Sequence, residues 1–368
     1  MDDIIAEIVR RKNAGECVAL ASLVWSSGSI PMSDRAKMIV GADGSIYGTI
    51  GGGCLEAEVL AASNAALTTG ENQLLRYTMT EKQAGESGLN CGGTVRIYTE
   101  LVEPGEDADL FDHVLTARRA REECVLATAL QAEGPATAAR LWIGRDGRTH
   151  GSLGSVEADR HIEEIMSECI GLERGRVYEL DLADSKPEIF VEPFLPEPIL
   201  YVFGGGHVGA QIGAMAKNVG FRVVVIDDRP AFANAARHPA ADECLVAEME
   251  EVFADLPIDD QAYIVAATRG HQHDEIVVEQ AIKTPARYVG MLGSERKKMM
   301  LWKRIEGRGG ERARLDWVHA PIGANIGADT PEEIAVSVVA ELIAVRRGSY
   351  KPWKTKRATV DVGQNAAR

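Results

Sequence analysis

The chain has 368 residues, and 40 Lys and Arg against 55 Asp and Glu give it a net charge of −15. Binding to nucleic acid phosphates depends on clustered cations, so this balance excludes a protein whose main surface binds nucleic acid, and it disfavours an acidic membrane surface for the same reason. The length predicts two or three domains.

The first 15 residues carry two acids and then Ile and Val at helical spacing, which predicts a short amphipathic helix ending at Gly15 rather than an export signal. The longest apolar stretches, such as 17–25, have the length of strands and fall short of the roughly 20 residues of a membrane helix. Six scattered cysteines without a Cys-x-x-Cys pair are typical of reduced thiols. We therefore expect a cytoplasmic protein with no membrane partner.

The first half of the chain contains an internal repeat. Residues 38–51 (MIVGADGSIYGTIG) align with residues 141–154 (LWIGRDGRTHGSLG), and upstream Glu16-Cys17-Val18 matches Glu123-Cys124-Val125. Each copy places an Asp-Gly hairpin turn between two strands and a glycine before a helix. We predict a domain over residues 1–186 that is built from two related αβ units.

The two copies differ where chemistry is expected. Only the first continues into Gly51-Gly52-Gly53-Cys54, and it also has a longer basic loop with Arg35 and Lys37. A glycine loop before a helix forms an anion cradle, and Cys54 falls in the first helical turn, where the helix dipole favours a thiolate. Thiolates bind soft metals. The alternative is that Cys54 is a small buried residue.

Cys91 is the other cysteine suited to a functional role, because the glycines of Cys91-Gly92-Gly93 leave its sulfur accessible. Burial is again the alternative for this thiol. We interpret Cys17 and Cys124, which lie in apolar strands, as buried core residues.

Four of the fourteen prolines fall within residues 187–198, which predicts an extended linker. After it, short β-branched runs alternate with helical segments, the pattern of a parallel sheet. The predicted fold class is therefore α/β, with a duplicated N-terminal α/β domain followed by a Rossmann-type doubly wound parallel sheet over residues 199–350. Residues 351–368 are predicted to form a mobile basic tail.

An apolar strand runs directly into a Gly-x-Gly-x-x-Gly pattern formed by Gly204, Gly206 and Gly209. Such glycines allow the tight turn, the approach of the backbone to a pyrophosphate, and the packing of helix on strand. The next strand ends at Asp227, where an acid binds ribose hydroxyls. This pattern predicts a nucleotide site that prefers NAD to NADP, with His207 near the phosphates; an altered Rossmann site is the alternative.

Two later strands end in polar turns at the edge where open α/β sheets bind ligands. The first turn carries Arg269, His271 and His273, which are suited to binding an anion or transferring a proton. His271, His273 and Asp274 also suggest a metal site, although ligands so close together on one turn seldom complete one. The second turn, residues 293–298, is rich in cations and opens another helix.

Taken in order, these motifs resemble those of the XdhC/CoxI family. The resemblance extends over about residues 16–348 and rests on Gly-Ser-Ile-Pro, Gly-Thr-Ile-Gly-Gly-Gly-Cys-Leu-Glu, Cys-Gly-Gly, Phe-Gly-Gly-Gly-His-Val-Gly, Asp-Asp-Arg-Pro, Thr-Arg-Gly-His and Gly-Met-Leu-Gly-Ser. Members of that family are accessory factors for molybdenum hydroxylases such as xanthine dehydrogenase and carbon monoxide dehydrogenase. One departure is Met32, where many members have arginine; Arg35 and Lys37 are the nearest remaining cations.

The resemblance implies binding of the molybdenum cofactor (molybdopterin), help with its sulfuration, and its delivery to an apo molybdenum hydroxylase. It implies a cysteine desulfurase as a second partner and a homodimer as the assembly. The family's cofactor-binding motifs fall on Gly51, Gly52 and Gly53, with Cys54 and Cys91 as the implied molybdenum ligands. Because the chain lacks iron–sulfur cysteine spacing, the resemblance implies a chaperone rather than a xanthine dehydrogenase.

Two other functions remain open. The nucleotide pattern alone ranks an NAD(P)-dependent oxidoreductase first, and it predicts turnover of a small substrate with NADH. Free thiols and an uncommon glycine loop also fit a non-catalytic protein that senses a nucleotide or the redox state and binds a partner in response. This third function predicts no bound molybdenum.

Overall fold

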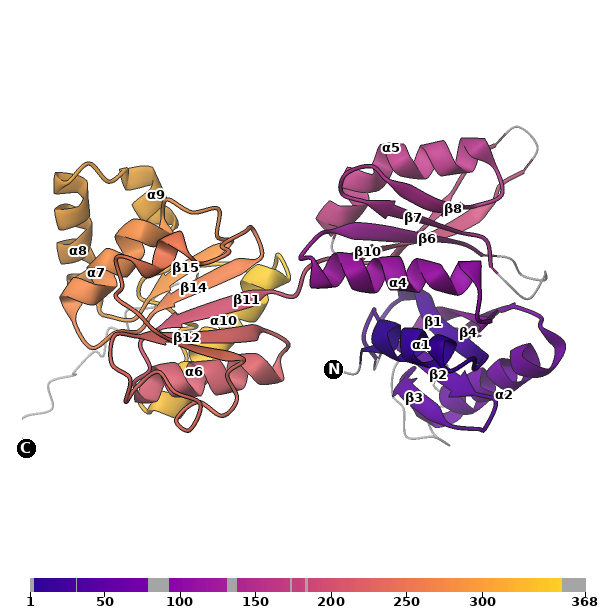
Figure 1. Ribbon diagram of the computed structural model, residues 1–368, viewed down its shortest axis with the longest axis horizontal. Coiled ribbons are helices and arrows are strands. Elements are labelled where there is room, and N and C mark those ends of the chain that lie inside the picture. The colour runs from indigo at the N-terminus through magenta and orange to yellow at the C-terminus, as the bar shows by residue number, and fades with distance from the viewer. Residues whose placement is uncertain are drawn as a thin grey trace, which may run out of the picture. The chain divides into compact units, whose positions relative to one another are not determined.

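The computed structural model describes residues 3–30, 32–78, 93–130, 138–172, 174–182 and 185–352. The chain divides into two units, residues 1–196 and 197–368, and each is described by itself (Figure 1). Within the described ranges, no helix combines the length and the apolar surface that a membrane span requires.

The first unit contains the same succession of elements twice. The first copy comprises α1 (Ile4–Asn13), β1 (Val18–Ser27), β2 (Lys37–Gly41), β3 (Ile46–Thr49), α2 (Gly53–Thr69), β4 (Gln73–Thr78) and β5 (Thr94–Val102). The second comprises α4 (Glu106–Arg119), β6 (Cys124–Leu130), β7 (Arg140–Gly144), β8 (Thr149–Ser152), α5 (Val156–Leu172), β9 (Arg176–Glu179) and β10 (Glu188–Phe194).

The sheets of the two copies have one topology. Their antiparallel strands follow the orders β3-β2-β1-β5-β4 and β8-β7-β6-β10-β9, so every strand of the first copy has a counterpart in the second. The predicted duplication is confirmed. The strand register shifts the predicted alignment of the upstream segments by one residue. Val18 pairs with Gly41 and Cys124 pairs with Gly144, so Val18 rather than Cys17 corresponds to Cys124.

The two sheets of the first unit pack with α1 and α4 between them, while α2 and α5 cover the outer faces (Figure 1). The sheets also contact each other through ion pairs. Lys37 on β2 pairs with Glu192 on β10 at 3.0 Å, and Arg140 on β7 pairs with Glu100 on β5 at 2.5 Å. Since β7 and β10 are the counterparts of β2 and β5, the two contacts are reciprocal.

The register shows how closely the reciprocal contacts match. Lys37 pairs with Ser22, and Arg140 pairs with Thr128, the counterpart of Ser22. A third ion pair joins Arg96 on β5 to Glu188 on β10, and these two residues occupy equivalent positions in the two copies. The copies are therefore related by an approximate twofold axis that passes near this pair.

Most of the predicted linker is strand β10, so the linker interpretation of residues 187–198 is wrong for Glu188–Phe194. This strand pairs with β6 along its whole length, but β9 reaches only as far as Val191. Pro193 therefore lies where β10 has a neighbour on one side only, a position that tolerates a residue without an N–H group. The division between the two units falls after Pro196.

The second unit is a doubly wound parallel sheet of β11 (Ile199–Phe203), β12 (Arg222–Asp227), β13 (Glu243–Val246), β14 (Ala262–Ala266) and β15 (Tyr288–Met291), in the order β13-β12-β11-β14-β15. Its helices are α6 (His207–Asn218), α7 (His271–Ala281), α8 (Glu295–Gly307), α9 (Arg312–Trp317) and α10 (Pro331–Arg346), with a 3-10 turn, η1 (Val252–Ala254). The predicted Rossmann-type fold is confirmed.

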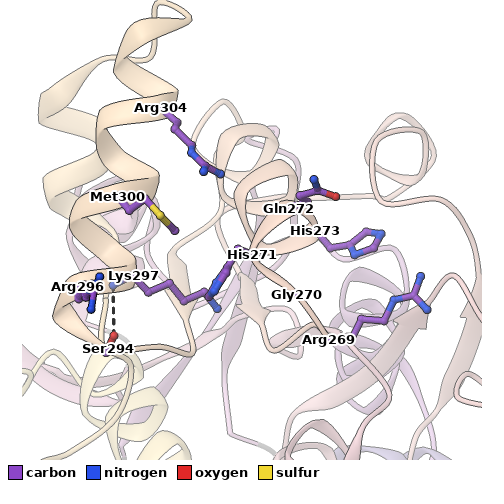
Figure 2. A pocket seen from close by; sticks show the side chains of 10 residues that line it. All are labelled: Arg269, Gly270, His271, Gln272, His273, Ser294, Arg296, Lys297, Met300 and Arg304. Atoms are coloured by element: carbon purple, nitrogen blue, oxygen red, sulfur yellow. Dashed lines mark hydrogen bonds between the residues drawn. The ribbon is translucent and has the colours of Figure 1, made fainter.

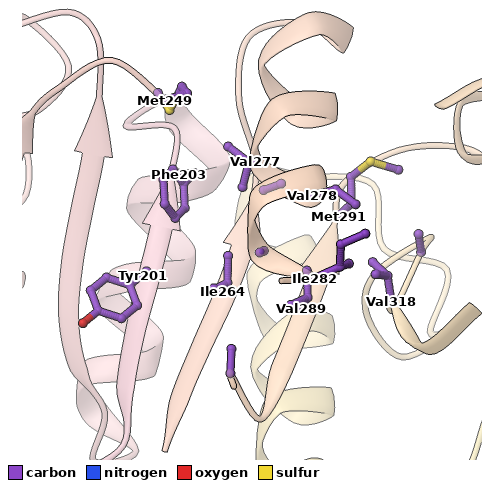
Figure 3. Close-up of a cluster of buried hydrophobic side chains, with 14 of the residues drawn as sticks. Tyr201, Phe203, Met249, Ile264, Val277, Val278, Ile282, Val289, Met291 and Val318 are labelled. Atoms are coloured by element: carbon purple, nitrogen blue, oxygen red, sulfur yellow. The ribbon is translucent and has the colours of Figure 1, made fainter. Parts of the chain in front are cut away.

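Each face of this sheet buries its own core. One core lies between the sheet and α7, α8 and α9, and Figure 3 shows part of it, with Phe203 and Ile264 of the sheet beside Val277 of α7. The other core lies under α6 and α10. The capping box expected at Thr330 and Glu333 starts α10. Both faces are covered, so ligands reach the sheet at its strand ends.

Candidate functional site

The glycine loop of the first copy has a backbone that only glycine adopts easily. Gly51, Gly52 and Gly53 have φ angles of +123°, +90° and +69° in succession. They lead into α2, whose N-cap residue Gly52 offers no side-chain hydrogen bond to the first turn. Cys54 lies in that turn, as predicted, and its side chain is exposed. Among the described residues, an exposed thiol thus lies beside backbone N–H groups that no side-chain cap satisfies.

The second copy ends its hairpin in the same way but caps its own helix. Gly154 has a φ of +88°, and its N–H donates to Ser152, as Gly51 donates to Thr49 in the first copy. The residue aligned with Gly52 is Ser155, whose hydroxyl accepts a hydrogen bond from the backbone N–H of Ala158. One copy satisfies its helix start with a side chain, whereas the other leaves it open.

Met32 contacts the glycine loop, and Gly93 of the Cys-Gly-Gly motif contacts Ser29, three residues before Met32. A Cβ atom on Gly51 would lie 2.8 Å from the terminal methyl of Met32, and one on Gly93 would lie 2.7 Å from the carbonyl oxygen of Ser29. Met32 and Ser29 therefore contact Gly51 and Gly93 respectively, although 42 positions separate these glycines in the sequence. Cys91 and Gly92 lie outside the described residues, as does Pro31.

Lys37 is not placed to bind a ligand at this loop, which corrects the sequence prediction. Its ammonium group donates to Ser22, pairs with Glu192 and lies 5.6 Å from the ring centre of Phe190. The lysine side chain is 12% exposed, because it lies between the two sheets. Arg35 is exposed in the loop before β2, so it is the one predicted cation that stays on the surface.

In the second unit, Gly204 and Gly209 have the predicted close packing, and Gly206 lies in open space. A Cβ on Gly204 would lie 2.3 Å from the carbonyl oxygen of Ala267, and one on Gly209 would lie 1.9 Å from that of Gly204. Gly206 has no atom within 4 Å of such a Cβ, so its backbone is open to a ligand. His207 is the first residue of α6, and its side chain is exposed.

Near Asp227, the chain's own residues occupy the space beside the glycine loop 204–209 where a ribose would bind. The carboxylate of Asp227 is 2% exposed and accepts four hydrogen bonds: one from the N–H of Gly205 and three from the backbone and guanidinium of Arg229. Burial alone would raise the pKa of Asp227, but Arg229 and the N–H groups outweigh it and lower that pKa. Four bonds fill the carboxylate's acceptor sites, so a ribose could bind Asp227 only if Arg229 moved.

Phe232 adds to this closure. Its carbonyl oxygen lies 2.0 Å from where a Cβ on Gly205 would be, and its ring lies under the guanidinium groups of Arg229 and Arg237, 3.6 Å and 4.7 Å from its centre. Arg237 also donates to the carbonyl of Gly205 at 2.9 Å. The segment after β12 thus occupies the ribose side of the loop, which fits the altered Rossmann site that the sequence left open.

The turns after β14 and β15 line one pocket of about 1000 Å³ between α7 and α8 (Figure 2). The predicted residues Arg269, His271 and His273 line it from the α7 side. Ser294 and a cationic face of α8 complete it, and its lining residues are Arg269, Gly270, His271, Gln272, His273, Ser294, Arg296, Lys297, Met300 and Arg304. His271 therefore lies in a concave site of the size that binds small molecules.

The metal site suggested by His271, His273 and Asp274 does not form. Asp274 is fully buried, and its carboxylate accepts from the backbone and hydroxyl of Thr268 and pairs with Lys297. Among the described residues, no group of three or more His, Cys, Asp or Glu side chains is arranged to bind a metal ion.

Sequence reasoning missed a buried polar network under a second pocket, of about 680 Å³. Tyr288 donates to Glu341 at 2.7 Å, and Nδ1 of His319 lies 3.1 Å from the same carboxylate oxygen. Burial and then Glu341 raise the pKa of Tyr288 well above its ordinary value. The polar spacing of Ser337 and Glu341 in an otherwise apolar stretch of α10 is the only signal that pointed there.

Comparisons with known proteins give a consistent result. Residues 200–342 match the family model described as the XdhC Rossmann domain, and residues 12–78 match the model described as the XdhC and CoxI family. A Bacillus subtilis protein, whose name describes it as a probable xanthine dehydrogenase subunit, is 25% identical over 334 residues, which are 90% of this chain and 94% of that protein.

Two further matches cover most of the chain. An uncharacterised Escherichia coli protein, YqeB, is 24% identical over 94% of this chain, but the match spans only 47% of YqeB. A crystal structure from Bacillus halodurans, described as a xanthine dehydrogenase, is 23% identical and covers 95% of this chain and 98% of its own, with a TM-score of 0.77. At this identity the structural match shows the fold alone.

Proposed function

Because the chain belongs to the XdhC and CoxI family, we propose that it is an accessory factor in the maturation of a molybdenum hydroxylase of the xanthine dehydrogenase type. Its B. subtilis relative carries the name of a xanthine dehydrogenase subunit, which supports a link to that enzyme. A hydroxylase would need iron–sulfur cysteine spacing, which the sequence lacks. A helper that serves the enzyme therefore accounts for the sequence better than the enzyme itself.

In this proposal the first copy of the repeat binds the molybdenum cofactor at Gly51–Cys54. The observation that carries this proposal is the difference between the two copies. The start of α2 has no side-chain cap and is followed by the exposed Cys54, whereas Ser155 caps α5, the corresponding helix of the second copy. A molybdopterin presents a phosphate and a soft metal centre. The open N–H groups suit the phosphate, and the thiol of Cys54 suits the metal.

Cys91 is the second proposed thiol ligand, and Arg35 is the proposed cation, because Lys37 is engaged with Glu192. When bound, the cofactor supplies the molybdenum and dithiolene sulfurs that the hydroxylase needs; this chain supplies only the groups that hold them. We further propose a cysteine desulfurase as the sulfur donor, a homodimer as the working assembly, and the cytoplasm as the location, where thiols remain reduced.

A nucleotide-binding role is the second candidate, and the open backbone at Gly206 favours it. The engagement of Asp227 with Arg229 counts against recognition of an NAD ribose at the usual acid. This role covers both the NAD(P)-dependent oxidoreductase and the nucleotide- or redox-sensing protein, which a titration with NAD distinguishes from the proposed function.

We expect the purified chain to retain released molybdenum cofactor through anaerobic desalting, at close to one molybdenum per binding site. Cys54→Ala or Cys91→Ala is expected to lower the retained molybdenum at least about tenfold, because the loss of a thiolate ligand weakens a soft metal site. Cys17→Ala is the matched control, since that half-buried thiol lies just before β1. Metal analysis and pterin fluorescence give the two readouts.

Equal retention by all three variants would rule out a thiol ligand. No retention by the wild-type chain would favour the nucleotide-binding candidate and make the NAD titration decisive.

A further inference from the structure

The pocket between α7 and α8 has a charge opposite to that of the whole chain. Its lining includes four permanent cations and two histidines, with no acid among the described lining residues: Arg269, Arg296, Lys297 and Arg304, with His271 and His273. The chain as a whole has a net charge of −15. Like charges gathered in one concave surface repel each other, and a bound anion relieves that repulsion.

Acids outside the pocket pair with three of these four cations. Asp274, which is fully buried, pairs with Lys297, while Glu275 accepts from Arg304 at 3.3 Å and Asp228 from Arg269 at 2.6 Å. This arrangement fixes the cations without placing a negative charge in the cavity. It is typical of a preorganised site rather than of a solvated surface.

The cations keep donors for a ligand. The ammonium of Lys297 donates to Asp274 and to the carbonyl of Leu292, which uses two of its three N–H groups. Arg304 makes one contact of the five that its guanidinium offers. Arg296 is exposed and makes no ion pair with the residues that the structure describes.

The start of α7 adds to the positive potential. Its N-cap residue Gly270 provides no side-chain hydrogen bond, so the first N–H groups of this 11-residue helix lie open beside His271. Figure 2 shows Lys297 extending from α8 toward His271, with Arg304 reaching into the same gap from further along α8. Side-chain cations and a helix start therefore converge on one volume.

We propose that this pocket binds a small molecule that carries a diphosphate. Lys297 and Arg304 lie on one face of α8, seven residues or roughly 10 Å apart along the axis, so this helix offers two separate cations, one for each phosphate of a linked pair. The volume of about 1000 Å³ leaves room for a group of nucleoside size. This inference does not depend on the proposed function, because every lining residue lies in the second unit and no molybdenum is involved.

The test is calorimetric titration of the full chain with pyrophosphate, ADP, sulfate and adenosine at one ionic strength. We expect saturable binding of pyrophosphate and ADP, with sulfate and adenosine at least about tenfold weaker, since charge-assisted bonds to two phosphates carry the affinity. The double variant Arg296→Ala and Arg304→Ala is expected to weaken pyrophosphate binding at least about tenfold.

The matched control is the double variant Lys303→Ala and Arg308→Ala. It removes the same charge from α8 and its C-cap residue, and Arg308 pairs with Glu275 as Arg304 does, but neither Lys303 nor Arg308 lines the pocket. We expect it to change the dissociation constant less than about twofold, because distant surface charges act only through screened attraction.

Three results would overturn the proposal. One is the absence of pyrophosphate and ADP binding by the wild-type chain at millimolar concentration. Another is an equal loss of affinity in both double variants while circular dichroism shows both folded. The last is binding of sulfate or adenosine as tight as that of ADP.

Discussion

Replacing Arg140 with methionine is expected to destabilise the first unit by about 3–5 kcal/mol, because it leaves the carboxylate of Glu100 buried without a partner charge. The two side chains are 1% and 4% exposed and lie 2.5 Å apart between the sheets. The guanidinium also lies 5.2 Å from the ring centre of Phe111. Most of this loss of stability comes from the buried, unpaired carboxylate of Glu100, and less of it from the lost contact with Arg140.

The reciprocal pair provides the control. Lys37→Met breaks the pair with Glu192, whose two side chains are 12% and 15% exposed, so water can solvate the remaining carboxylate. We expect a smaller loss, about 1–2 kcal/mol. Arg140→Met combined with Glu100→Met is expected to recover part of the stability, because no buried charge remains.

Hydrogen exchange in a urea series measures these changes, since amides of β6 and β7 report the first unit separately from the second. If Arg140→Met costs no more than Lys37→Met, the buried pair does not stabilise the contact between the sheets.

The second large effect is expected at the glycine pattern, where Gly209→Ala should destabilise the second unit by about 3 kcal/mol or more. The new methyl carbon would lie 1.9 Å from the carbonyl oxygen of Gly204 and 3.2 Å from a methyl of Val202. Gly204 is in the tight turn after β11 and Val202 is in β11 itself, so neither neighbour has much room to shift. The helix would have to move off the sheet.

Gly206→Ala is the matched control, three residues before Gly209 at the N-cap of α6. Gly206 has an extended backbone with a φ of −70°, and no atom lies within 4 Å of an added Cβ. We expect its unfolding free energy to stay within about 0.5 kcal/mol of wild type. Thermal unfolding measures both variants, and similar midpoints for the two would contradict the assigned roles.

Much of the fold follows from local sequence. The strand before Gly204, the helix after it and the capping box at Thr330 depend on neighbours within a few residues, and the structure has each of them. The repeat was also predictable, because two Asp-Gly hairpins with aligned glycines impose the same local geometry twice.

The errors arose where distant residues decide the outcome. The sequence offers Lys37 as a ligand cation, but Glu192 engages it across the sheets, from a strand of the other copy. Residues 188–194 are predicted to be a linker because the prolines are visible in the local sequence. The pairing of β10 with β6, which makes these residues a strand, cannot be recognised from the local sequence. The sequence does not identify Arg304 as a residue of the pocket, because Arg304 faces the polar turns only when α8 packs beside α7.

The measurement that tests the accessory role most directly is transfer of molybdenum to a client. The chain, loaded with cofactor, is mixed with the apo form of a xanthine dehydrogenase-type hydroxylase, and the two proteins are separated before metal analysis. We expect molybdenum to move to the hydroxylase faster than from free cofactor, and the Cys54→Ala chain to give no acceleration. Transfer at the same rate with and without the chain would contradict the proposed function.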